Sequence, residues 1–181
     1  MTFDLEELAE FLVTAKKATY AGDGAEVATP ERPGFKELQF TQGDWDYRDS
    51  YAGFFLAPGQ EVVRFQGRPV WAMSYTGGMT ERFQNDQAFA TQYAGLTEEE
   101  LVPLFQSEAK QKVLGKVEVT RPFRGPEEFL DTAEWTYQSK TKGDISDFLG
   151  EEFIHHRGED FMHKTVFKQA YLGGLIVPKE F

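Results

Sequence analysis

The sequence carries one pattern twice, and this repetition constrains the fold more than any other feature. Phe3–Leu8 has the sequence Phe-Asp-Leu-Glu-Glu-Leu, and Leu96–Leu101, 93 residues later, has Leu-Thr-Glu-Glu-Glu-Leu. Asp4 and Thr97 each stand three residues before a glutamate, which is the spacing of a helix N-cap and, for threonine, of a capping box. The apolar residues around each cap have the spacing of a hydrophobic staple. Both segments are therefore predicted to begin a helix.

Both predicted helices continue with apolar residues at helical spacing. One stripe consists of Leu5, Leu8, Phe11, Leu12 and Ala15, and the other of Leu101, Leu104, Phe105 and Ala109. Such stripes indicate amphipathic helices that pack on a core. Each stretch reaches a glycine at a matched offset, Gly22 or Gly115, which suits a left-handed C-terminal cap. Pro103 cannot donate a backbone hydrogen bond, so the second helix is expected to kink or to start near it.

Three further signatures occur in the same order in both halves, at offsets of 90 to 96 residues. They match residues 45–47 with 135–137, 59–63 with 150–154, and 70–79 with 166–175. Their β-branched and aromatic content, with Gly and Pro between the runs, is typical of strands joined by hairpins. Each half is therefore expected to contain a helix, a long connection and about three strands.

The sequence predicts an α+β fold: an antiparallel sheet with helices packed on one face, made of two helix-plus-meander repeats related by a pseudo-two-fold axis. We expect a single domain over residues 1–181, with repeats at about 3–79 and 96–176. A weak helix is expected in the linker at 80–95. Two points stay open. The first is whether the halves arose by duplication or are similar but unrelated segments. The second is whether the strands form one curved sheet or two packed sheets.

Charge and cysteine content exclude several classes of function. Thirty acidic against nineteen basic residues give a net charge of −11, which repels phosphate backbones, so we expect no nucleic-acid binding by the chain itself. The charge favours solubility or a cationic partner. The chain has no cysteine, which excludes disulfides and thiolate chemistry. Without a secretory leader or an apolar run of ~20 residues, we expect a cytoplasmic protein with no membrane contact.

An aromatic face with one carboxylate is the main candidate site. On a strand, Trp45, Tyr47, Asp49 and Tyr51 share one face by their period of two, and such a face suits a planar or cationic small molecule. The full candidate ligand-binding set is Lys17, Tyr20, Glu37, Trp45, Tyr47, Asp49, Tyr51, Trp71 and Tyr75. The alternative is a packed core in which tyrosine hydroxyls reach Asp49 or backbone groups.

All three histidines lie in one polar cluster near the end of the chain. Glu152, His156 and His163 are the weak candidates for a metal site, because histidines and carboxylates are the ligands left to a cysteine-free chain. Consecutive residues His155 and His156 point to opposite faces of a strand, and no H-E-x-x-H pattern is present. A solvated hairpin without metal is favoured, and no cofactor is expected.

Several runs resemble an uncharacterised bacterial domain family. They are residues 15–22, 49–53, 59–63, 67–75, 124–126 and 171–176, so the resemblance extends over nearly the whole chain. Its second-half motifs are looser, and the 157–165 hairpin is longer than the family pattern. Members of the family sometimes follow a helix-turn-helix module of the Xre type, which implies a sensor or ligand-binding role. The resemblance supplies no catalytic residue.

Three functions follow as hypotheses. The first, which we favour, is a non-enzymatic domain that binds a small molecule in an aromatic groove. The second is a protein-interaction module or homodimer without a small ligand. The third is an enzyme that uses the Glu152/His156/His163 region.

Overall fold

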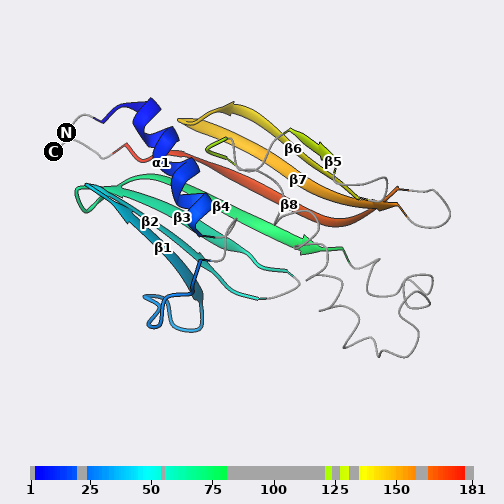
Figure 1. The fold of residues 1–181 in the computed structure, drawn as a ribbon, viewed down its shortest axis with the longest axis horizontal. Coiled ribbons are helices and arrows are strands. Elements are labelled where there is room, and N and C mark those ends of the chain that lie inside the picture. Colours follow the sequence, from blue (N-terminus) through cyan, green and yellow to red (C-terminus); the bar gives the residue numbers. More distant parts are fainter. Residues whose placement is uncertain are drawn as a thin grey trace.

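One antiparallel sheet with a helix against it forms the described part of the chain (Figure 1). The computed structural model describes residues 3–19, 24–53, 56–80, 121–123, 127–130, 135–157 and 163–177. Its elements are α1 (Leu5–Ala18), β1 (Lys36–Gln42), β2 (Trp45–Tyr51), β3 (Gly59–Phe65), β4 (Arg68–Met79), β5 (Glu128–Leu130), β6 (Trp135–Asp144), β7 (Asp147–Arg157) and β8 (His163–Leu175).

The first predicted helix is confirmed. The Asp4 carboxylate accepts a hydrogen bond of 2.8 Å from the backbone N–H of Glu6, which satisfies one of the N-terminal donors that a helix leaves unpaired. Leu8, Phe11, Leu12, Ala15 and Lys16 are buried along one side of α1. The apolar stripe seen in the sequence is thus the packing face of the helix, except for Leu5 at its start, which is 43% exposed.

The sheet consists of two four-stranded meanders joined at their last strands. The strand order is β1-β2-β3-β4-β8-β7-β6-β5, and every neighbouring pair is antiparallel. The three strand signatures predicted in each half fall in β2, β3 and β4 and in β6, β7 and β8. The strands therefore form one continuous sheet, which was one of the two arrangements left open by the sequence.

The predicted α+β class, with helices packed on one face, was wrong. In the described ranges α1 is the only helix, and it lies against a sheet of eight strands, so the fold is closer to all-β. The sequence concealed two of these strands. β1 precedes the first signature, and β5 has only three residues, too few for a period of two to be visible. The helices predicted at 97–109 and within 80–95 lie outside the described residues.

The two meanders carry the same irregularities at matched positions. The register shifts between Val63 and Arg64 on β3, and between Ile154 and His155 on β7. Gly59 lies opposite Tyr75, and in the other meander Gly150 lies opposite Tyr171. A Cβ on either glycine would collide with the facing tyrosine ring. Tyr75 and Tyr171 are themselves Cα partners across β4–β8. Such matches are expected from a duplication with a two-fold axis between these tyrosines. The duplication itself stays a prediction.

The hydrophobic core lies between α1 and one side of the sheet, which we call the inner face. Trp45 packs against Phe11, Phe3 and Phe65, with ring centroids 5.4, 5.5 and 4.5 Å away. Aromatic pairs at these separations contribute packing beyond the area they bury. Trp71, fully buried, donates its indole N–H to the carbonyl of Ile145 at 3.0 Å. This bond joins the two meanders.

No helix among the described residues is both long enough and apolar enough to cross a bilayer.

Candidate functional site

Polar side chains are buried on the inner face of both meanders. Four tyrosines and three carboxylates point to this side of the strands, and none is more than 9% exposed. They are Tyr47, Tyr75, Tyr137, Tyr171, Asp49, Glu61 and Glu152, which we call the inner-face cluster. Burying such groups costs free energy unless each is hydrogen-bonded or paired with an opposite charge. Their contacts therefore decide what the site can do.

A fully buried ion pair connects α1 to the sheet. The Nζ of Lys16 lies 2.6 Å from Oε2 of Glu61, and neither side chain is exposed. The same ammonium donates a hydrogen bond of 2.6 Å to the carbonyl oxygen of Phe123, and it lies 5.8 Å from the ring centroid of Trp71. A buried ion pair is seldom more stabilising than well-packed apolar residues, but removing one partner leaves a buried charge. Lys16 thus fixes the position of α1.

The first meander places a carboxylate beside the central tyrosine. Tyr75 donates its hydroxyl proton to Oδ1 of Asp49 at 2.7 Å, in a buried hydrogen bond. Asp49 and Glu61 are Cα partners across β2–β3, so two carboxylates occupy neighbouring positions on one face. The Lys16 ammonium against Glu61 offsets the repulsion between them.

The second meander has the same arrangement with different chemistry. Ser139 faces Glu152 across β6–β7, the position that Asp49 holds opposite Glu61. The Tyr171 hydroxyl lies 3.0 Å from Oγ of Ser139 and 2.6 Å from Oγ1 of Thr141, where either atom of each pair can donate. Glu152 accepts a hydrogen bond of 2.8 Å from the hydroxyl of Tyr137. Hydroxyls therefore stand where the first meander has a carboxylate.

The structure places six of the nine predicted ligand-binding residues on the inner face. Trp45, Tyr47 and Trp71 pack in the hydrophobic core, and Asp49 and Tyr75 are joined by a buried hydrogen bond. The sixth is Tyr51.

Tyr51 is half-buried at the end of β2 and donates to Oε1 of Glu26 at 3.1 Å. Burial and the neighbouring Glu26 carboxylate raise the pKa of Tyr51 to about 12. Lys17 is exposed on α1, and Tyr20 lies outside the described residues. Asp49 and Tyr75 are thus the predicted residues that the structure joins by a direct hydrogen bond, whereas Tyr51 bonds to Glu26.

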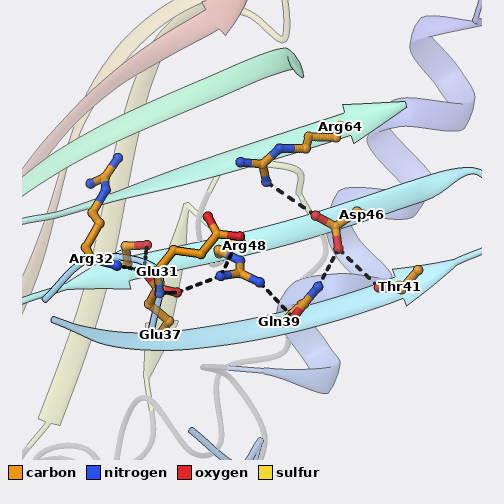
Figure 2. Close-up of polar contacts among 9 residues, drawn as sticks. Glu31, Arg32, Glu37, Gln39, Thr41, Asp46, Arg48 and Arg64 are labelled. Atoms are coloured by element: carbon orange, nitrogen blue, oxygen red, sulfur yellow. Dashed lines mark hydrogen bonds and ion pairs between the residues drawn. The ribbon is translucent and has the colours of Figure 1, made fainter. Parts of the chain in front are cut away.

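Glu37 lies on the opposite, outer face, away from the other candidates. Figure 2 shows it beside Arg48. Its buried carboxylate accepts from the backbone N–H groups of Glu31 and Arg32 at 3.0 and 3.2 Å, the Ser50 hydroxyl at 3.0 Å and Arg48 at 2.8 Å. Burial raises the pKa of Glu37, but these donors outweigh it and hold the pKa below its usual range. Its donors come from β2 and from the segment before β1, so Glu37 holds that segment against the sheet.

The outer face continues this pattern as a network of exposed or half-buried side chains. Asp46 accepts from Gln39 at 2.8 Å, from Thr41 at 3.1 Å and from Arg64 at 3.3 Å, and the three donors surround it in Figure 2. Exposed ion pairs of this kind contribute only ~0–1 kcal/mol each. The buried polar groups of the inner face are therefore the stronger candidate for function.

Lys16 and Glu61 are not among the residues predicted from the sequence, although the sequence contains a signal for Lys16. Lys16 follows Leu8 and Leu12 at intervals of four, so it falls on the buried stripe, whereas the selected residue Lys17 does not. A lysine on such a stripe requires a buried partner. Glu61 was hidden because Val62 and Val63 are both apolar, so β3 shows no clear alternation.

The weak metal candidates are divided between two strands. Glu152 lies on the inner face of β7, and His156 is half-buried near the end of the same strand. The side chain of His163, the first residue of β8, lies outside the described set. Among the side chains that the structure does describe, no group of three or more His, Asp or Glu residues could hold a metal ion.

Comparison with known proteins gives a family but no activity. A family model named domain of unknown function DUF5680 matches residues 49–176, from the end of β2 to just beyond β8. No curated protein and no solved structure gives a significant match. The matched region contains Asp49, Glu61, Tyr75 and Glu152, whereas α1 with Lys16 precedes it. Because the match extends over more than half of the chain, the protein belongs to the DUF5680 family.

Proposed function

We propose that the chain is a non-enzymatic domain of sensor or effector type that binds a small molecule against the inner-face cluster. The observation that carries the proposal is the burial of tyrosines and carboxylates on both sides of the β4–β8 junction, where well-packed apolar residues are often at least as stabilising. Functional sites are among the places where proteins bury titratable groups together, and this supports the proposal. An effector role is also what the resemblance to domains that follow Xre-type regulators implies.

The chemistry of the cluster favours a donor-rich ligand. Carboxylates are acceptors, and tyrosine combines a hydroxyl with an aromatic face that attracts cations. Asp49 with Tyr75 supplies both groups on the first meander, and Glu152 with Tyr137 supplies both on the second. Amines and hydroxylated amines match this set.

A thermal-shift screen tests the proposal. The probes are spermidine, choline, ethanolamine and glucosamine at millimolar concentration, because a ligand that binds only the folded state raises Tm. We expect at least one amine to raise Tm, and Asp49→Asn and Glu152→Gln to remove the shift. Glu151→Gln is the matched control, because Glu151 adjoins Glu152 in sequence but is half-exposed on the outer face. Failure of all four probes, or shifts that persist in both inner-face variants, would contradict the proposal.

A second candidate, a protein-interaction module or homodimer, is favoured by one exposed apolar pair. Leu149 and Leu172 are Cα partners across β7–β8 on the outer face, and they are 58% and 64% exposed. Paired exposed leucines are more typical of an interface than single ones. Light scattering on the wild type and on Leu149→Ser/Leu172→Ser distinguishes this candidate: a wild-type dimer that the double variant abolishes supports it, and a monomeric wild type contradicts self-association. The cytoplasmic location expected from the sequence stays a prediction.

A further inference from the structure

The segment before β1 wraps around the edge of the sheet. Residues 24–35, which we call the strap, lead into β1, the first strand in the order of the sheet. The backbone N–H of Val27 donates to the carbonyl of Glu37 at 2.8 Å, on the side of β1 away from β2. The strap therefore occupies part of an edge that would otherwise present free backbone groups.

On the inner side, one side chain of the strap holds the start of β1 and the end of β2. Oε1 of Glu26 accepts from Nζ of Lys36 at 2.9 Å and from the hydroxyl of Tyr51 at 3.1 Å. Lys36 and Tyr51 are Cα partners, so Glu26 bridges the two strands. Lys36 and Glu26 are about half exposed, so this ion pair contributes little to holding the strap.

On the outer side, a side chain of β1 binds the backbone of the strap. The buried Glu37 carboxylate accepts from the N–H groups of Glu31 and Arg32, and Ser50 and Arg48 on β2 donate to the same carboxylate (Figure 2). Hydrogen bonds to a charged, buried acceptor are the strong ones among side-chain contacts. The strap is thus fixed from both faces of the edge strand, and mainly by Glu37.

The backbone of β1 has a defined set of outward groups. In an antiparallel strand the N–H and C=O of one residue point to the same side, and the side alternates along the chain. Because the Glu37 carbonyl points away from β2, the backbone groups of Gln39 and Thr41 point outward as well. Three outward residues spaced by two are a template for a further antiparallel strand.

We propose that the strap masks the edge of β1 and keeps the chain from pairing edge to edge with a second copy of itself. A second copy is the fitting occupant, because antiparallel pairing about Gln39 is self-complementary: each copy sets its residue 37 opposite residue 41 of the other. Backbone pairing of this kind requires no matching side chains. The strap is therefore a protective element of the edge.

The variant Glu37→Gln tests the proposal, since it keeps the side-chain size but removes the charge that holds the strap. We expect hydrogen exchange at the amides of Glu31 and Arg32 to accelerate by about tenfold or more. Sedimentation velocity at about 100 μM in physiological salt should show a higher association state than the wild type. Asp46→Asn is the matched control, because Asp46 bonds to β1 and β3 side chains but not to the strap.

Two further variants make the result decisive. Adding Gln39→Pro to Glu37→Gln removes an outward N–H without a β1–β2 bond and should restore the wild-type association state. If Glu37→Gln does not fold, Val27→Pro removes the strap's donor to the β1 backbone and is measured instead. The proposal is overturned if strap amides exchange faster while the association state stays that of the wild type. It is also overturned if Gln39→Pro leaves the new association intact.

Discussion

The two meanders share a scaffold but differ in the charge that they bury. β1–β4 and β5–β8 have the same strand order about the β4–β8 junction, and each has a glycine beneath a central tyrosine. In the first, Tyr75 bonds to a carboxylate, and Glu61 pairs with a buried ammonium. In the second, Tyr171 meets two hydroxyls, and Glu152 accepts from a phenol. The backbone thus constrains the position of these groups and leaves their chemistry free to differ.

The largest expected effect is on the buried ion pair of the first meander. Lys16→Met leaves Glu61 buried without its ammonium, and we expect a loss of ~3–5 kcal/mol in the free energy of unfolding. Urea unfolding measures it. Lys17→Met is the control, and because Lys17 is exposed we expect a change within ~0.5 kcal/mol.

The corresponding carboxylate of the second meander should matter less. Glu152→Gln keeps an acceptor for the Tyr137 hydroxyl, so we expect a loss of only ~1–2 kcal/mol. The comparison of Glu152→Gln with Glu61→Gln in the same urea experiment sharpens the contrast between the meanders. Equal losses of unfolding free energy for the two variants would contradict this contrast. They would mean that the Lys16 ammonium does not make the first meander more sensitive to the loss of its carboxylate.

The two central tyrosines give a smaller difference in the same direction. Tyr75→Phe removes a hydrogen bond to a charged acceptor and is expected to cost ~1.5–3 kcal/mol. Tyr171→Phe removes bonds to neutral hydroxyls and should cost ~0.5–1.5 kcal/mol. Thermal unfolding of both variants tests the order, and a greater loss for Tyr171→Phe would contradict it.

Acid should affect the two meanders through different carboxyls. The donors to Glu37 hold its pKa below 4.5, and the Ser146 hydroxyl and N–H lower the pKa of the exposed Asp144. A lowered folded-state pKa contributes stability that is present above the unfolded value and is lost as pH falls through the folded one. We expect Glu37→Gln to reduce the loss of stability as pH falls below ~4.3, the ordinary pKa of glutamate.

Asp144→Asn should reduce the same loss less, because solvent screens an exposed group. Urea unfolding at a series of pH values measures both variants. An effect of Asp144→Asn as large as that of Glu37→Gln would show that burial of Glu37 is unimportant.

The sequence predicted those features that depend on local chemistry. The Asp4 cap and the apolar stripe of α1 are local, and they located the helix. Alternation within β2 correctly placed Trp45, Tyr47, Asp49 and Tyr51 on one face. These patterns need no knowledge of other elements.

What the sequence could not give depends on how the strands pair. Glu37 was grouped with the inner residues, because nothing within a strand indicates which of its faces continues the face of its neighbour. The packing of α1 over Trp45 and Trp71 also depends on tertiary structure. It places these two rings in the hydrophobic core and not in a ligand-binding groove. The pairing of β4 with β8, which decides that the sheet is continuous, joins residues about a hundred positions apart.

The claim that the inner-face cluster binds a small molecule is tested most directly by co-crystallisation with the amine that gives the largest thermal shift. The account predicts density for that amine within about 3.2 Å of the carboxylate of Asp49 or Glu152. Protein atoms packed against both carboxylates and all four tyrosines, with the amine absent or bound elsewhere, would contradict it.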